Sequence, residues 1–288
     1  MGTLSLPKPL ERVQLDDFYL RRTEFASENE LWLWRARARS SDRKMGLPEL
    51  AAFALLLQAY GGHDLKRFLL VARPRLRRLF PGLLSYARLS HWLGRIEPFL
   101  LDFLSEAAPR RPSGRETILV DSTKIDSHLL KNRPKSLSGL ARVGHSHEGA
   151  WIGLKLHLAV ARDGSLRAWD LTPGSAHDLA PVKGGLLSGL RGVCFADSGY
   201  VSAQVRQELK PQDLLMGAKP TAAMEFERWE FDRKWAKAYR QRQVVEGVFK
   251  VLKGSCGLLS RGVRAAAKLR ARVWASLAAY CLRKTQAS

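Results

Sequence analysis

The stretch from Trp151 to Leu171 constrains the fold more than any other part of the sequence. Residues 151–161 alternate in polarity as a β-strand does, and a second strand pattern covers residues 166–171. Between them stands Asp163-Gly164, a dipeptide typical of a tight hairpin turn. We therefore predict a hairpin here, and with it a sheet in this part of the chain.

Shorter patterns on both sides of the hairpin extend the predicted sheet. Residues 117–120 form a β-branched run that ends at Asp121, and residues 192–196 form an apolar run that ends at Asp197. Further along we predict a helix over 201–209, a strand over 213–217 and one long helix over 233–253. Strands followed by alternating helices and strands indicate an α/β sheet with helices packed on it.

The chain before residue 106 has a helical texture instead. Pro48 to Tyr60 opens with a proline, which suits the first turn of a helix, and helical patterns continue over 65–79 and 83–104. Residues 106–114 are small, polar and proline-rich, as is typical of a domain boundary. We predict a helical domain over 1–110 and an α/β domain over 115–288.

The charge indicates the kind of partner. The formal net charge is +21, which favours a polyanion such as nucleic acid. A ribosomal or chromatin-type basic protein is the alternative, but such proteins are usually shorter or have disordered tails. The three cysteines are far apart and form no CxxC pair, so a reducing compartment is expected. With neither a signal peptide nor a membrane span in the pattern, we expect a cytoplasmic bacterial protein associated with the nucleoid.

Asp121 and Asp197 stand in matching settings. Each follows a short apolar run and precedes small or polar residues, in VDSTK and ADSGY. A carboxylate at the end of a buried strand points into the crevice where α/β sheets bind ligands. Either residue alone also fits an ordinary turn or cap aspartate, so it is the matched pair that favours a functional site.

Glu246 is the only acid among residues 233–288, which contain fourteen Lys or Arg residues. Spacings of three and four residues place it on one face of the predicted helix with Tyr239, Arg242, Lys250 and Lys253. On the opposite face we predict an apolar stripe that packs on the sheet, formed by Val244, Val248 and Leu252. The alternative role for Glu246 is a helical salt bridge with Arg242 or Lys250.

This helix resembles the Y-R-E-K signature of insertion-sequence transposases of the DDE type, which it matches at Tyr239, Arg242, Glu246 and Lys253. VDSTK at Asp121 resembles the segment of the family's first acid, and ADSGY at Asp197 resembles that of the second. WIGLKLHLAV (151–160) and LTPGSAHD (171–178) also resemble family segments. The resemblance covers most of the chain.

The resemblance implies a ribonuclease H-like catalytic domain over 115–288, with a mixed α/β sheet flanked by helices. A smaller all-α domain over 1–110 would precede it, and its charge and position predict DNA binding. The implied catalytic and metal-binding residues are Asp121, Asp197 and Glu246. They would hold two Mg²⁺ or Mn²⁺ ions, one at the attacking oxygen and one at the leaving oxygen of the phosphodiester.

The implied function is that of a DNA transposase. Such an enzyme binds the terminal inverted repeats of a mobile element, cleaves at its ends and joins the 3′ ends to target DNA. We expect double-stranded DNA as the partner, a homodimer in the active complex and no membrane. The expected DNA-binding residues are Tyr239, Arg242, Lys250, Lys253, Lys155, Arg261 and Arg264.

Two other functions stay open: a ribonuclease H-like nuclease that does not join strands, and an inactive DNA-binding protein derived from a transposase. Some relatives carry a long β-strand insertion between the second Asp and the Glu. Residues 198–245 leave no room for one, so any role of that insertion, such as stabilising a hairpinned DNA end, is not expected here.

Several histidines invite other interpretations. His128, His145, His147 and Glu148 lie close in sequence, but no cysteine joins them, and we predict a DNA-contacting loop rather than a zinc site. His157 and Lys155 share a strand face, which fits either the DNA or active-site side or a core or edge position. His177 and Asp178 fit a helix start, for which Asp is a good cap.

Overall fold

The computed structural model describes residues 45–58, 64–108, 114–128, 141–146, 149–218, 233, 235–258 and 265–287. Contacts divide the chain into two units. One comprises the described residues of Met1–Ala107 and Leu252–Ser288, and the other comprises those of Ala108–Val251. The predicted boundary near residue 110 lies close to the first division. The C-terminal residues, however, group with the N-terminal helices and not with the α/β domain to which the sequence analysis assigns them.

The first unit is helical in its described part. Its elements are α3 (Leu47–Leu56), α4 (Leu65–Leu79), α5 (Tyr86–Arg95), α6 (Glu97–Ala107) and α12 (Ala266–Ala287). The single helical pattern over 83–104 is therefore two helices, with a break at Ile96. Glu97 joins α12 to α6, because its carboxylate accepts hydrogen bonds from Arg270 Nε at 3.2 Å and from Trp274 Nε1 at 3.0 Å. The final helix thus packs back on the helical core.

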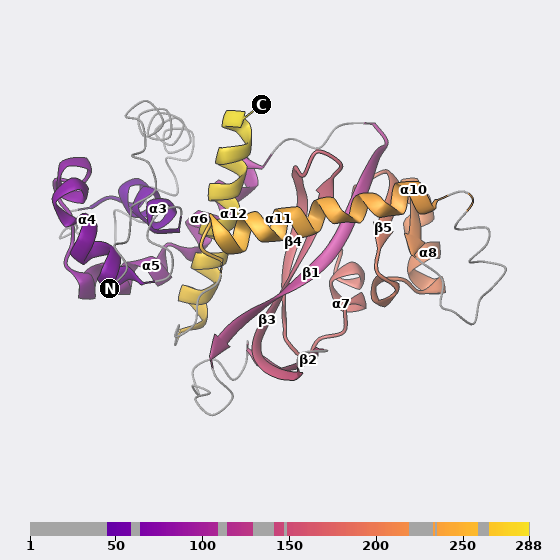
Figure 1. The fold of residues 1–288 in the computed structure, drawn as a ribbon, viewed down its shortest axis with the longest axis horizontal. Coiled ribbons are helices and arrows are strands. Elements are labelled where there is room, and N and C mark those ends of the chain that lie inside the picture. Colours follow the sequence, from indigo (N-terminus) through magenta and orange to yellow (C-terminus); the bar gives the residue numbers. More distant parts are fainter. Residues whose placement is uncertain are drawn as a thin grey trace. The chain divides into compact units, whose positions relative to one another are not determined.

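The second unit is built on a mixed sheet (Figure 1). Its described strands are β1 (Glu116–His128), β2 (Arg142–Ser146), β3 (Gly149–Ala161), β4 (Leu166–Pro173), β5 (Gly192–Ala196) and β6 (Leu214–Ala218). The order is β2-β3-β1-β5-β6, with β4 also paired to β3. β3 is antiparallel to β1, β2 and β4, whereas β1, β5 and β6 run parallel.

The β3–β4 hairpin forms where the sequence predicts it. Gly164 has a φ of 84°, the left-handed conformation that glycine adopts without strain. The Asp163 carboxylate tightens the same turn by accepting from the Ser165 backbone N at 2.8 Å. β1, in contrast, continues through Asp121 to His128, so Asp121 lies within a strand rather than at its end. Its antiparallel pairing with β3 reaches past Asp121 and supports this extension.

Helices cover both faces of the sheet. Helices α7 (Leu179–Lys183) and α8 (Ala203–Leu209) pack against one core, which includes Ile118, Val120, Cys194, Ala196, Leu214 and Met216. On β5, Phe195 has the opposite orientation to Cys194 and Ala196, because side chains alternate along a strand. Its ring meets Trp235 and Tyr239 edge-on, with centroids 5.9 and 6.2 Å apart. The segment that carries Glu246 therefore begins against this second face.

The predicted long helix over 233–253 is interrupted. It consists of α10 (Ala236–Tyr239), the 3₁₀ turn η6 (Arg240–Arg242) and α11 (Gln243–Gly254). The residue spacing does not distinguish a continuous α-helix from one interrupted by a 3₁₀ turn, because both the α-helix and the 3₁₀ helix bring residues three apart to the same side. The buried stripe of α11 is Val245, Val248, Phe249 and Leu252, so Val248 and Leu252 were predicted correctly. Val244 is only half-buried, and Val245 takes its place.

Candidate active site

Asp121 and Asp197 lie on neighbouring parallel strands. The β1–β5 ladder pairs Glu116 with Gly192 and Leu119 with Phe195. Continuing this register by two residues brings Asp121 opposite Asp197, which directly follows β5. Both carboxylates therefore stand at the same edge of the sheet, at the C-terminal end of β5, where α/β sheets bind ligands.

Arg242 joins the two carboxylates. Its Nη2 donates to Asp121 Oδ2 at 3.1 Å, and its Nη1 lies 3.8 Å from Asp197 Oδ1. Nη1 also donates to the Tyr239 hydroxyl at 2.7 Å, and the guanidinium carbon lies 5.3 Å from the Tyr239 ring centroid. Tyr239 packs on Phe195 of β5, so this aromatic contact positions the guanidinium over the acids.

The two aspartates differ in exposure. The Asp121 side chain is 22% exposed and that of Asp197 is 65% exposed. Burial raises the pKa of the Asp121 carboxyl, and the nearby Asp197 charge raises it further, while Arg242 and the Ser122 backbone N–H act in the opposite direction. Asp197 caps the 3₁₀ turn η4 (Ser198–Tyr200) by accepting from Ser198 N at 3.0 Å. Each acid thus keeps one oxygen on a backbone amide, which fixes its orientation.

Glu246 lies on α11, one helical turn beyond Arg242. It is exposed, and the structure contains no ion pair from it to Arg242 or Lys250, all three of which are described. Arg242 binds Asp121 instead. The helical salt bridge that was the alternative for Glu246 is therefore absent. Within the described ranges, however, no group of three or more His, Cys, Asp or Glu residues is gathered closely enough to hold a metal ion.

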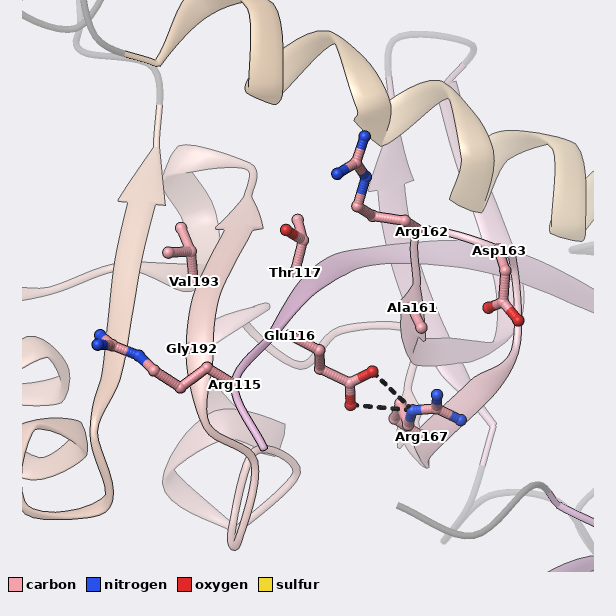
Figure 2. Close-up of a pocket in the computed structure, with 9 residues that line it drawn as sticks. All are labelled: Arg115, Glu116, Thr117, Ala161, Arg162, Asp163, Arg167, Gly192 and Val193. Atoms are coloured by element: carbon pink, nitrogen blue, oxygen red, sulfur yellow. Dashed lines mark hydrogen bonds and ion pairs between the residues drawn. The ribbon is translucent and has the colours of Figure 1, made fainter. Parts of the chain in front are cut away.

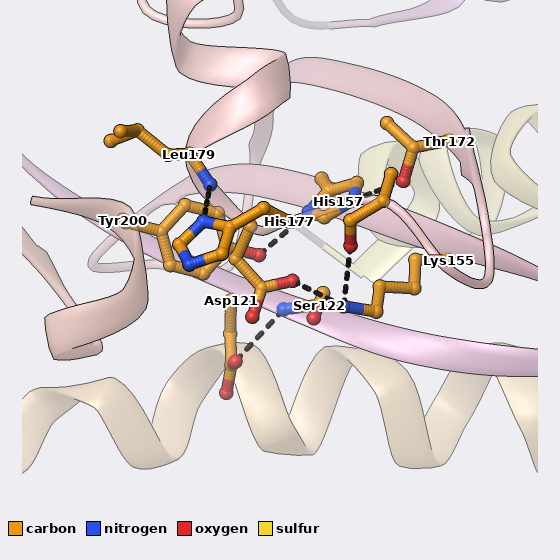
Figure 3. Close-up of polar contacts among 10 residues, drawn as sticks. Asp121, Ser122, Lys155, His157, Thr172, His177, Leu179 and Tyr200 are labelled. Carbon is orange, nitrogen blue, oxygen red and sulfur yellow. Dashed lines mark hydrogen bonds and ion pairs between the residues drawn. The ribbon is translucent and has the colours of Figure 1, made fainter. Parts of the chain in front are cut away.

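A buried hydrogen-bonded chain lies on the other face of β1 (Figure 3). Ser122 follows Asp121 and therefore has the opposite orientation. On this face the Tyr200 hydroxyl lies 2.7 Å from His157 Nδ1. His157 Nε2 lies 2.8 Å from Thr172 Oγ1. The chain links the turn that follows Asp197 to β3 and β4.

His157 is fully buried in this chain and belongs to the core rather than to the DNA-facing surface. Burial lowers its pKa to about 4, with Lys155 acting in the same direction and Asp178 in the opposite one. The imidazole is therefore neutral at neutral pH, and one ring nitrogen donates while the other accepts. Because both nitrogens have partners, the ring holds Tyr200 and Thr172 at once.

Lys155 is held in an ion pair. Its Nζ donates to Asp178 Oδ1 and to the Ala176 carbonyl oxygen, both at 2.9 Å. Asp178 precedes α7, as predicted, but its side chain makes no capping hydrogen bond, because the carboxylate is turned to Lys155. His177 takes the role of a cap, since its Nδ1 accepts from Leu179 N at 3.2 Å. These pairings tie the loop after β4 to β3.

The other predicted DNA-binding residues are only partly described. Lys250 is exposed on α11, and Lys253 is half-buried near the end of the same helix. Arg261 and Arg264 lie outside the described residues, as do His147 and Glu148 of the histidine cluster. His145 lies on β2 opposite Ala150 and is exposed.

A pocket of about 550 Å³ lies at the opposite edge of the sheet, where β1 and β5 begin (Figure 2). Arg167 Nε donates to both oxygens of Glu116 there, at 2.9 and 3.1 Å. Gly192, which has a φ of 112°, is one of the residues that line it. Asp197 follows the far end of β5, so this pocket is separate from the acids. The sequence analysis does not predict this pocket, because its lining residues come from the starts of β1 and β5 and from the β3–β4 hairpin, which are far apart in the sequence.

Comparisons with known proteins were made for the sequence and for the fold. A family model described as a transposase DDE domain matches residues 113–261, more than half of the chain, including all three predicted acids. The cryo-EM structure of the piggyBac transposase synaptic complex with hairpin DNA superimposes with a TM-score of 0.52 at 12% identity, covering 95% of this chain and 76% of that chain. This likeness confirms the predicted fold class, a mixed α/β sheet flanked by helices. A search of curated proteins finds no match. Among the described residues, no helix is long and apolar enough to cross a membrane.

Proposed function

This chain belongs to the family of transposases with a DDE domain, and we propose that it cuts the ends of a mobile DNA element and joins them to target DNA. Metal-dependent DNA cleavage and transfer is the activity that the family implies. The observation that carries the proposal for this chain is the shared guanidinium: Arg242 contacts both Asp121 and Asp197, with Glu246 one turn further along its helix.

The donor set fits divalent metal ions. Asp121 and Asp197 offer neighbouring carboxylate oxygens, the hard ligands that Mg²⁺ and Mn²⁺ prefer. The Arg242 guanidinium already lies on both carboxylates in the described structure, and this contact with a cation supports the proposal. We propose that Asp121, Asp197 and Glu246 hold two Mg²⁺ or Mn²⁺ ions, which requires the three acids to come closer together than they lie in the described structure. When bound, such ions activate the attacking oxygen and stabilise the charge on the leaving oxygen.

The basic residues around the acids would hold DNA. Tyr239, Arg242, Lys250 and Lys253 would bind phosphates beside the scissile bond, since their helix must approach DNA if Glu246 is catalytic. Arg261, Arg264 and Lys155 remain predicted DNA contacts, although the Lys155 ammonium is engaged by Asp178 in this structure. Arg242 would then change partners, from the two aspartates to a phosphate, as a divalent ion takes over the carboxylates.

The proposed order has two steps. Water attacks the phosphodiester at the element's end, which frees a 3′ hydroxyl, and that hydroxyl then attacks a phosphodiester of target DNA and displaces its 3′ oxygen. Both steps need the same arrangement of acids, so one site serves for both. Joining two element ends at one target requires two such sites, and we therefore propose a homodimer bound to double-stranded DNA, including the terminal inverted repeats.

The test uses the full chain with duplexes taken from the two ends of the DNA segment that contains its gene. Mg²⁺ or Mn²⁺ is added, and cleaved and joined products are separated by size. Metal-dependent cleavage at the element boundary, followed by joining and absent in Glu246→Gln, supports the proposal. Cleavage without joining would indicate a nuclease. DNA binding without cleavage in any metal would indicate an inactive DNA-binding relative and overturn the proposal.

A further inference from the structure

Helix α4 (Leu65–Leu79) has a basic face. Its exposed cationic residues are Lys66, Arg67, Arg73, Arg77 and Arg78. Positions 66, 70, 73 and 77 follow spacings of four, three and four residues, which keep them on one side of a helix. The structure contains no ion pair from any of the five cations within the described residues. No acid occurs between Leu65 and Leu79, so the helix cannot neutralise itself.

The other side of α4 is already buried. Leu65, Phe68, Leu69, Ala72 and Leu76 are each at most 9% exposed. Phe68 also packs on Phe53 of α3, with ring centroids 5.9 Å apart. The basic face is therefore held outward on a packed helix rather than being one half of a free amphipathic helix. A lipid surface would need the apolar half, which is not accessible.

One apolar side chain interrupts the basic face. Leu70 is 82% exposed, more than any other large apolar residue among those described. It lies between Lys66 and Arg73 on the same side of the helix. An exposed leucine flanked by cations suits the floor of a DNA groove, where apolar side chains contact thymine methyl groups while the flanking cations bind phosphates.

We propose that α4 is a DNA-docking helix that enters the major groove, with its cations on phosphates and Leu70 against base edges. The inference rests on the proposed function only in taking double-stranded DNA as the partner. A helix of 15 residues is about 22 Å long, and the major groove is about 12 Å wide. The helix is therefore long enough to place cations on both phosphate backbones. Arg73 and Arg77 are one turn apart, and a phosphate between them relieves their repulsion.

The charge part of the proposal is tested by salt dependence. The full chain is titrated with a random-sequence duplex at several salt concentrations, beside the triple variant Lys66→Gln, Arg73→Gln and Arg77→Gln. Each lost phosphate contact lowers the slope of log K against log salt by about 0.9, so the variant's slope falls by about 2.7. Between about 50 and 200 mM salt, the wild type should therefore lose roughly 40-fold more affinity than the variant does.

The matched control removes a cation elsewhere. Lys210 is exposed in the 3₁₀ turn η5 (Lys210–Gln212), which precedes β6 at the sheet edge away from Asp197. Lys210→Gln should leave the slope unchanged. Circular dichroism verifies that all variants retain their helices. An unchanged slope in the folded triple variant overturns the proposal, as does a variant effect seen with anionic lipid vesicles but not with the duplex.

The groove-reading part is tested with Leu70→Ala. This variant should keep the wild-type salt slope but lose preference for terminal-repeat DNA over the random duplex, because a leucine–thymine contact carries sequence information and no charge. An unchanged preference overturns the role of Leu70. Failure of the transposase proposal has a different signature: no metal-dependent cleavage, with the α4-dependent salt slope intact. If α4 is not the docking helix, cleavage persists and the triple variant binds as the wild type does.

Discussion

Replacing His157 by glutamine should remove a specific part of the pH dependence of folding. His157 is fully buried between Tyr200 and Thr172, and its pKa is lowered to about 4 from the ordinary 6.5. Between these two values the unfolded chain binds a proton that the folded chain does not. The folded state is therefore favoured above about pH 6.5, and this contribution is lost as the pH falls toward 4.

The magnitude follows from the size of the shift. A shift of one pKa unit corresponds to about 1.4 kcal/mol, so the full effect is about 3 kcal/mol, of which about 2 kcal/mol falls between about pH 7 and pH 5. Glutamine can still donate and accept hydrogen bonds, but it does not titrate. The variant should therefore lose about 2 kcal/mol less stability than the wild type over the same pH interval.

Urea unfolding of the full chain at the two pH values, followed by circular dichroism, measures the difference. Carboxylates and the other histidines titrate in both proteins, so their effects cancel in the comparison. If the wild type and His157→Gln lose the same unfolding free energy between pH 7 and pH 5, His157 is not a neutral, buried link between Tyr200 and Thr172, and the reasoning fails.

Three further predictions concern the supports of the site. Arg242→Gln should lower the unfolding free energy without metal by about 1–3 kcal/mol, because two neighbouring carboxylates lose their shared cation. Mg²⁺ should restore part of the lost stability in thermal unfolding, and an unchanged unfolding temperature of the metal-free variant would contradict this. Gly192→Ala should destabilise the fold more than Gly185→Ala does. Both glycines have a positive φ, but only at Gly192 would an added Cβ clash with a backbone oxygen, that of Glu116, and equal unfolding temperatures of the two variants would refute this steric argument. Lys155→Met should lower the unfolding free energy measured in urea by about 1–3 kcal/mol, because the Asp178 carboxylate loses its cation. The control Lys183→Met, at an exposed position, should leave the unfolding free energy almost unchanged, and equal decreases in the two variants would argue against the ion pair.

Much of the sheet could be predicted because its strands have strong local patterns. β3 and β5 lie where the alternation and the apolar run predict them, and the Asp163-Gly164 turn closes the hairpin. The full length of β1 could not be read in the same way, because residues 121–128 are mostly polar and are held by pairing with β3 rather than by their own pattern. Long-range pairing overrides local preference here.

The candidate site was predictable in its acids but not in its contacts. The matched settings of Asp121 and Asp197 follow from their equivalent register on parallel strands, and this regularity is visible in the sequence. No local pattern indicates that Arg242 bridges them or that Lys155 turns to Asp178, since both contacts join segments far apart in the chain. The grouping of α12 with the N-terminal helices likewise depends on Glu97, far away in sequence.

The most direct test of the account measures Mn²⁺ binding to the full chain by electron paramagnetic resonance. Wild type is compared with Asp121→Asn, Asp197→Asn and Glu246→Gln, and with Glu208→Gln as a control at an exposed helical glutamate on α8. If the three acids form one metal site, each of the three variants should lose at least about 10-fold in affinity, since even outer-shell changes cost that much, and Glu208→Gln should bind as wild type. Wild-type affinity in Glu246→Gln would remove that residue from the site, and unchanged binding in all three variants would contradict the account.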